Sequence, residues 1–84
     1  MSEAIFKHFL GKARDAKKGG EDAWHCQSTG EKLAVALVLN RMDWLQSMDY
    51  TIAEAIDRVG PAWLSYILQV QRRLESDNFE DVPY

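Results

Sequence analysis

The chain has 84 residues, 46% of them hydrophobic, which predicts a single globular domain spanning residues 1–84. Its formal net charge of −3 is unfavourable for binding the phosphate backbone of nucleic acids, so a nucleic-acid partner is not expected. The longest apolar run, residues 33–39, is far shorter than the ~20 residues of a membrane helix, and the start Met1-Ser2-Glu3 is not typical of a signal peptide, so we expect neither a membrane span nor secretion.

The first predicted helix covers about residues 3–18, where apolar residues recur every three or four positions. This spacing places them on one face of a helix: Ile5, Phe6, Phe9, Leu10, Ala13 and Ala16. The pair Gly19-Gly20 then predicts the end of the helix. We expect residues 19–28 to form a loop.

The second predicted helix covers about residues 29–48 and is expected to lie at the centre of the fold. Ser28 and Glu31 have the spacing of a capping box, in which each residue hydrogen-bonds to the backbone of the other. The following run is rich in Ala and Leu, which favours a buried helix over a buried strand.

Two shorter helices are predicted after it, at about residues 52–59 and 61–76. Thr51 and Glu54 form a second capping-box pattern at the start of the first of these. Gly60 and Pro61 suit the boundary between the two helices, because proline favours the first helical position. Residues 77–84 contain acidic and aromatic residues together with Pro83, and we expect them to form an extended tail.

These elements predict an all-α fold, a small irregular four-helix bundle with an extended acidic-aromatic C-terminal tail. The three Trp, three Tyr and three Phe are more aromatic residues than a domain of this size can easily enclose. The predicted core consists of Phe6, Phe9, Leu10, Leu33, Leu37, Val38, Leu45, Ile52, Ile56, Trp63, Ile67, Val70 and Leu74.

The predicted loop contains a sequence of chemical interest, Trp24-His25-Cys26. A cysteine beside a histidine is a candidate nucleophile, or a metal site together with His8, but the regular ligand spacing of a metal site is missing. The simpler interpretation is a small buried thiol beside a surface imidazole. Because Cys26 is the only cysteine, we expect no internal disulfide and a reducing compartment, the cytoplasm.

Two further alternatives can be weighed from the sequence. Glu54 and Asp57 are close enough on a helix to form a catalytic carboxylate pair, although such charges usually form a solvated face. Residues 51–73 resemble a helix-turn-helix in outline, with Arg72 and Arg73 available to phosphates, although the opening of its second helix is too apolar for base contacts.

The leading prediction is a non-catalytic protein-interaction module, a small acidic regulator or inhibitor that binds a larger protein or forms a homodimer. A DNA-associated regulator is the first alternative and a small enzyme or metal protein using His25 and Cys26 is the second. We expect no enzymatic activity and no cofactor, because no phosphate-binding loop, nucleophile elbow or paired-cysteine motif occurs. The candidate partner-binding residues are Trp44, Trp63, Tyr66, Arg72, Arg73, Phe79 and Tyr84.

Overall fold

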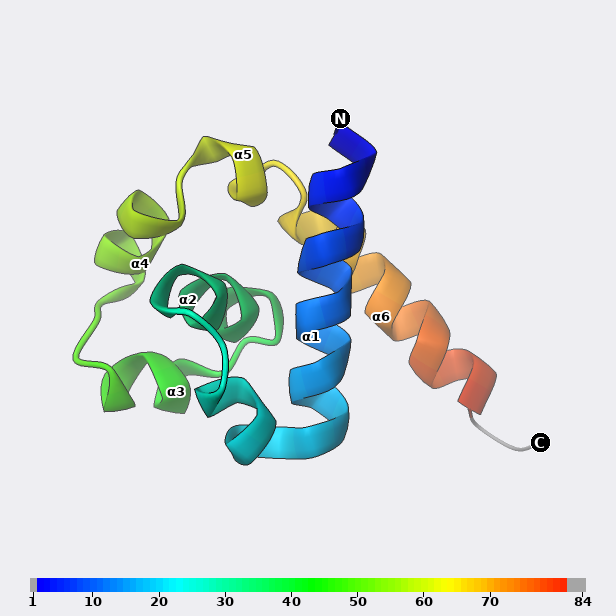
Figure 1. The fold of residues 1–84 in the computed structure, drawn as a ribbon, viewed down its shortest axis with the longest axis horizontal. Helices are drawn as coiled ribbons and strands as arrows, with labels where there is room; N and C mark the ends of the chain where they lie inside the picture. Colours follow the sequence, from blue (N-terminus) through cyan, green and yellow to red (C-terminus); the bar gives the residue numbers. More distant parts are fainter. Residues whose placement is uncertain (1, 82–84) are drawn as a thin grey trace.

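The computed structural model describes residues 2–81, with side chains for residues 4–77, and its regular structure in that range is entirely helical (Figure 1). The predicted all-α bundle is confirmed. Helix α2 contacts α1, α3, α4 and α6, so the predicted central position of this segment is also confirmed. No helix among the described residues combines the length and apolar character needed to cross a bilayer. The elements are α1 (Ser2–His25), α2 (Thr29–Val38), α3 (Met42–Ser47), α4 (Ile52–Val59), α5 (Pro61–Leu64) and α6 (Ile67–Asp81).

Helix α1 bends sharply at Gly20 and then continues to His25 (Figure 1). Gly20 has φ 70° and ψ −155°, a conformation essentially restricted to glycine. The glycine pair therefore interrupts the first helix where the sequence predicts an end. The prediction of a loop over residues 19–28 is wrong for its first part, because the chain resumes a helical turn after Gly20 and carries Trp24 back toward α2.

The predicted helix 29–48 is broken at Asn40, which has a positive φ of 57°. Two hydrogen bonds close the end of α2: Asn40 N donates to Leu37 O at 3.1 Å, and Arg41 N donates to Ala36 O at 2.8 Å. This pair of bonds is the Schellman motif, which usually requires glycine at the left-handed position. Asparagine adopts that conformation more easily than most L-residues, so the helix can end without a glycine signal.

A second motif of the same kind ends α3 at Asp49, which has φ 62°. Asp49 N donates to Gln46 O at 3.0 Å, and Tyr50 N donates to Leu45 O at 3.1 Å. The chain turns here and enters α4 directly. Asn40 and Asp49, nine positions apart and both left-handed, therefore end α2 and α3, which together replace the one predicted helix.

The predicted helix 61–76 is also divided, because the chain turns at Ser65 and Tyr66 between α5 and α6. Ser65 Oγ donates to Ala62 O at 2.9 Å, and Tyr66 N donates to Trp63 O at 2.9 Å. Helix α6 then continues to Asp81, so the prediction of an extended tail is wrong for residues 77–81. Residues 82–84, the end of the predicted tail, lie outside the described residues.

Both predicted capping boxes are confirmed. Ser28 N donates to Glu31 Oε1 at 3.0 Å, and Glu31 N donates to Ser28 Oγ at 3.3 Å. At the start of α4 the reciprocal bonds between Thr51 and Glu54 are both 3.0 Å. Gly60 separates α4 from α5 with φ 85° and ψ 163°, and proline follows at the first helical position, as the sequence predicts.

The core forms around α2, which contacts α1, α3, α4 and α6. Seven predicted core residues are buried: Phe9, Leu10, Leu33, Val38, Leu45, Val70 and Leu74. Four others are only half-buried against this cluster: Phe6, Leu37, Trp63 and Ile67. The prediction is wrong for Ile52 and Ile56, which are 52% and 44% exposed. Two tryptophans and several alanines were missed as core residues: Trp24, Trp44, Ala13, Ala16, Ala34, Ala36 and Ala55, together with Val35.

An ion pair between Arg14 and Asp77 links α1 to α6. Arg14 Nε donates to Asp77 Oδ2 at 2.7 Å and Nη2 donates to Oδ1 at 3.0 Å, a two-bond geometry that a planar guanidinium favours. The hydrogen bonds from Arg14, together with its charge and those of Arg73 and Lys17, outweigh desolvation and hold the pKa of Asp77 below its ordinary value.

We expect this contact to contribute acid-sensitive stability. Because the pKa of Asp77 is lower in the folded chain than in the unfolded chain, the contribution is present above the ordinary pKa of 3.8 and is lost as the pH falls through the folded value. Asp77→Asn should therefore lower the free energy of unfolding at neutral pH and have little effect in strong acid. Urea unfolding of both proteins at neutral and acidic pH measures the difference. An equal loss at both pH values would contradict the assignment.

Candidate functional site

The structure places Trp44 in the core, so the exposure expected of it as a partner-binding candidate is not found. Trp44 is 2% exposed and stacks on Trp24, with ring centroids 4.6 Å apart and an angle of 20° between the rings. Trp24 is fully buried, and its Nε1 donates to Lys32 O at 2.8 Å. The core therefore encloses two of the aromatic residues that the sequence analysis considered difficult to bury.

Cations cover the outer faces of the two stacked indoles. The guanidinium of Arg41 lies 4.2 Å from the centre of the Trp44 ring, and Lys32 Nζ lies 5.5 Å from that of Trp24. Arg41 also forms two hydrogen bonds with Asp43, at 3.0 and 2.8 Å, which lower the pKa of that carboxyl group. This arrangement closes the indole pair from solvent, although Trp44 Nε1 is buried without a hydrogen-bond partner in the described structure.

Trp63 and Tyr66 lie between the first and last helices. Trp63 stacks on Phe9 with centroids 4.9 Å apart and meets the edge of the His8 ring at 5.6 Å. Tyr66 packs against Phe6 with centroids 6.2 Å apart. Both candidate residues are half-buried. Their aromatic contacts join α1 to α5 and the turn before α6, which is a structural role.

His8 occupies a small polar cluster at the start of α2. His8 Nε2 and Glu31 Oε2 are 2.7 Å apart, and Lys12 Nζ lies 3.9 Å from Glu31 Oε1. Burial raises the pKa of Glu31, but hydrogen bonds from His8 and Ser28 and the Lys12 charge lower it by more, so the net shift is downward. Glu31 therefore completes the capping box of α2 and also links α2 to α1 through its contacts with His8 and Lys12.

The structure separates the functional groups of the Trp24-His25-Cys26 sequence. His25 Nε2 lies 3.3 Å from Glu21 Oε2, and Cys26 Sγ donates to Asp22 O at 3.4 Å, so each group pairs with a different residue one turn earlier. The expectation of a buried thiol is wrong, because Cys26 is exposed. Within the described residues, no three His, Cys, Asp or Glu side chains are grouped as metal ligands would be.

The remaining predicted residues lie on α6 or beyond it. Arg72 and Arg73 are exposed. The Phe79 side chain and all of Tyr84 are outside the described part of the chain. The hairpin proposed over residues 51–73 consists of α4, the single turn α5 and the beginning of α6, so its second helix is interrupted after four residues. DNA binding by this segment stays a prediction.

Helix α4 exposes two isoleucines that the sequence pattern places in the core. This helix buries Ala55 and half-buries Val59, whereas Ile52 and Ile56 remain 52% and 44% exposed. The two isoleucines are four residues apart and therefore neighbours on the helix surface. We call this pair the α4 ridge. One other large hydrophobic residue in the described range is comparably exposed, Leu68 on α6 at 53%.

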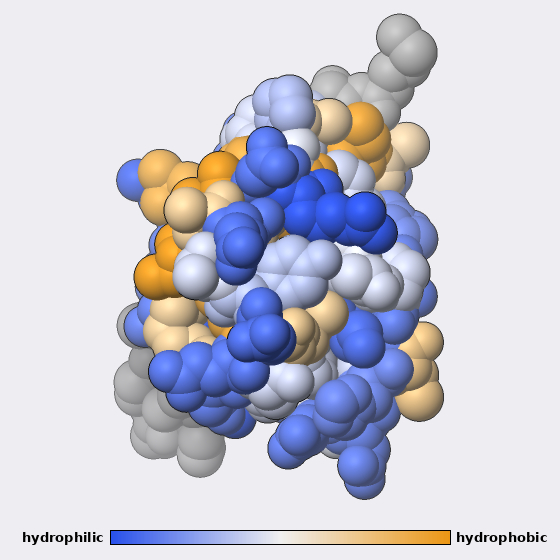
Figure 2. Space-filling view, turned by 90° about the vertical axis from the view of Figure 1, so that its left-hand side faces the viewer, coloured by the Kyte–Doolittle hydropathy of each residue, from blue (hydrophilic) through white to orange (hydrophobic). Residues whose placement is uncertain are grey.

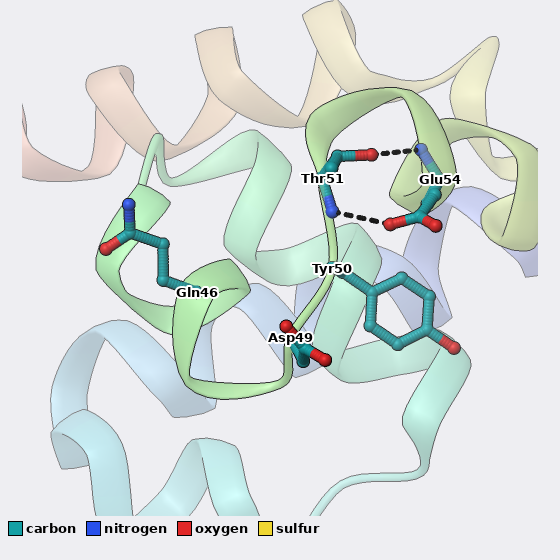
Figure 3. A pocket seen from close by; sticks show the side chains of 5 residues that line it. All are labelled: Gln46, Asp49, Tyr50, Thr51 and Glu54. Atoms are coloured by element: carbon teal, nitrogen blue, oxygen red, sulfur yellow. Dashed lines mark hydrogen bonds between the residues drawn. The ribbon is translucent and has the colours of Figure 1, made fainter.

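Two shallow hollows adjoin α4. One has a volume of about 340 Å³ and lies where the corner at Asp49 meets the start of the helix. Figure 3 shows the hydrogen bonds between Thr51 and Glu54 at the edge of this hollow, with the Asp49 and Tyr50 side chains on the chain leading to them. The second hollow, about 490 Å³, is lined by Asp49, Tyr50, Ala53, Glu54, Asp57 and Arg58.

The surroundings of the α4 ridge are acidic. Residues 41–60 contain four acidic and two basic residues, a net charge of −2, and Arg41 is already paired with Asp43. Asp49 and Asp57 take part in none of the ion pairs within the described side chains. Figure 2 views the face that α3 and α4 form: hydrophilic residues cover its centre, and hydrophobic residues gather along its left-hand border.

Together these features define a small all-α bundle that, within the described residues, carries an apolar ridge beside carboxylates outside the ion pairs, next to two shallow hollows. Compared with models of known protein families, with curated proteins and with solved structures, the chain shows no significant match. Function must therefore be argued from this surface.

Proposed function

We propose that the chain is a non-catalytic protein-interaction module and that it binds its partner through the α4 ridge. The observation that carries the proposal is the exposure of Ile52 and Ile56 in a domain that fully buries Trp24 and nearly all of Trp44. Large apolar side chains left side by side at a surface are typical of association sites.

The gain from covering the ridge can be estimated. Full burial of an isoleucine is worth about 1.5–3 kcal/mol relative to full exposure, and each residue of the pair retains roughly half of its exposure. Covering both side chains therefore contributes about 1.5–3 kcal/mol, a factor of roughly 10 to 150 in the dissociation constant. This contribution is large enough for the ridge to form the centre of an interface whose rim is polar.

The test is a comparison of three baits: the wild-type chain, the double variant Ile52→Ser/Ile56→Ser, and Leu68→Ser as a control. All replaced residues are about half exposed, so we expect each variant to remain folded, which circular dichroism checks. A protein from the native host that binds specifically should be retained by wild type and by Leu68→Ser. It should bind the double variant at least about tenfold more weakly.

The captured protein is then purified and its affinity for all three baits is measured by calorimetry. Size-exclusion chromatography with light scattering determines in parallel whether the chain associates with itself and whether the double variant abolishes that association. If the double variant retains its partners as well as Leu68→Ser does, the α4 ridge is not the binding surface. A monomer that retains no protein specifically would contradict the proposed function itself.

A further inference from the structure

We infer that the segment of the partner that contacts the α4 ridge is a basic amphipathic helix. Its apolar stripe would cover Ile52 and Ile56, and its lysine or arginine side chains would lie opposite Asp57 and Asp49. This inference rests on the proposed function and adds the chemistry of the partner to it.

The order of residues around α4 supports an amphipathic partner. At about 100° per residue, the surface beside Ile56 passes to Ala53 and then to Asp57. Ala53 is exposed and small, and it lines the 490 Å³ hollow together with Asp57. A partner side chain therefore has room above Ala53, next to Asp57. A partner helix that has an apolar stripe with charged residues along one side would match this order of apolar, small and acidic positions around α4.

The charges around the ridge favour a basic partner. Asp49 and Asp57 are exposed and, like the exposed Arg58 in the same hollow, take part in none of the ion pairs of the described side chains. The hollow also contains Glu54, whose Oε1 accepts a hydrogen bond from Thr51 N at 3.0 Å, so three acidic side chains face one basic side chain there. Exposed ion pairs are screened by solvent, so they add little to affinity. Their main effects are on the choice of partner and on the rate of association.

The geometry of the ridge favours a helix over an extended peptide. Ile52 and Ile56 are one helical turn apart, about 6 Å, which matches apolar residues at the same spacing on a second helix. Recognition of an apolar helix face by another helix is a common mode of peptide binding. Binding of an extended peptide by β-strand addition would need a strand edge, and the described residues contain no strand.

Helices α4 and α1 of a second copy are poorer occupants. Two-fold packing of α4 on α4 would bring the same carboxylates of both copies together, which costs energy. The basic first helix exposes Lys7, Lys17 and Lys18. However, none of the large hydrophobic residues that are strongly exposed in the described range lies on α1, so this helix lacks the stripe needed to cover the ridge.

The experiment uses two synthetic helical peptides with the same leucine stripe, one bordered by lysines and the other by glutamates. Each is labelled and titrated with the full chain, and binding is followed by fluorescence anisotropy at low and high salt. We expect the lysine peptide to bind at least about tenfold more tightly than the glutamate peptide, and to lose affinity as the salt concentration rises.

Variants test the contributions of the apolar ridge and of the carboxylates to peptide binding separately. Ile56→Ser should weaken binding of the lysine peptide about three- to tenfold, whereas Leu68→Ser should leave it unchanged. The double variant Asp49→Asn/Asp57→Asn should reduce both the affinity and its dependence on salt, whereas Asp15→Asn on α1 is the matched control for a general charge effect.

Equal binding of the two peptides, no binding of the lysine peptide, or equal effects of the Asp15 and Asp49/Asp57 variants would each overturn the inference. The proposed function would survive these results if capture of a native partner still required Ile52 and Ile56. Loss of that requirement would instead contradict the proposed function, so the two failures can be told apart.

Discussion

Replacement of Trp24 by alanine is expected to lower the free energy of unfolding by about 3–5 kcal/mol. Trp24 is fully buried, stacks on Trp44 at 4.6 Å, and donates a hydrogen bond to Lys32 O. Alanine would leave a cavity beneath the second indole and remove that hydrogen bond. Native proteins have a total stability of about 5–15 kcal/mol, so this loss removes a large fraction of it.

Urea unfolding followed by circular dichroism measures this loss. Trp24→Phe provides a graded comparison, because it keeps an aromatic ring while removing the indole donor, and it should cost less than the alanine variant, about 1–2 kcal/mol. The phenylalanine variant also keeps the prediction measurable if the alanine variant does not fold. A loss below about 1 kcal/mol for Trp24→Ala would show that this ring is not part of the core.

Replacement of Gly60 by alanine should lower the free energy of unfolding by about 1–3 kcal/mol. Its φ of 85° and ψ of 163° lie in a region that only glycine adopts without strain. A Cβ atom at this position would meet no heavy atom within 4 Å, so the cost arises from the backbone and not from crowding. The strain would fall on the junction between α4 and α5.

Gly11→Ala is the matched control, because the same substitution is expected to change the free energy of unfolding in the opposite direction. Gly11 lies within α1, and a Cβ atom there would also meet nothing within 4 Å. Alanine should therefore raise the free energy of unfolding by about 0.5–1 kcal/mol through its higher helix propensity. Chemical denaturation of both variants measures the two changes. A neutral Gly60→Ala variant would contradict the backbone conformation found at this junction.

The proposed function and the Trp24 prediction concern separate parts of the molecule. The indole pair lies in the core, whereas the α4 ridge is exposed and its replacement should leave the fold intact. This separation makes the binding experiments interpretable, because a loss of binding by Ile52→Ser/Ile56→Ser can be distinguished from a loss of structure by circular dichroism.

The features that the sequence by itself determined are those set by neighbours three or four residues away. The capping boxes at Ser28 and Thr51, the boundary at Gly60 and the apolar stripe of α1 all depend on backbone and side-chain groups within one turn. The all-α class follows from the same periodicity. These predictions are confirmed because local hydrogen bonding and spacing are sufficient to specify them.

Other features were decided only by the tertiary structure. Asn40 and Asp49 end helices in a conformation that glycine usually provides, so the break within residues 29–48 was marked only by residues that are weaker signals than glycine. Trp24 enters the core because the chain bends at Gly20 and resumes a helix that packs on α2. The sequence pattern assigned an apolar face to α4, but the elements packed beside it decide how much of that face is covered. Ile52 and Ile56 therefore remain at the surface, because burial depends on contacts between residues far apart in the chain.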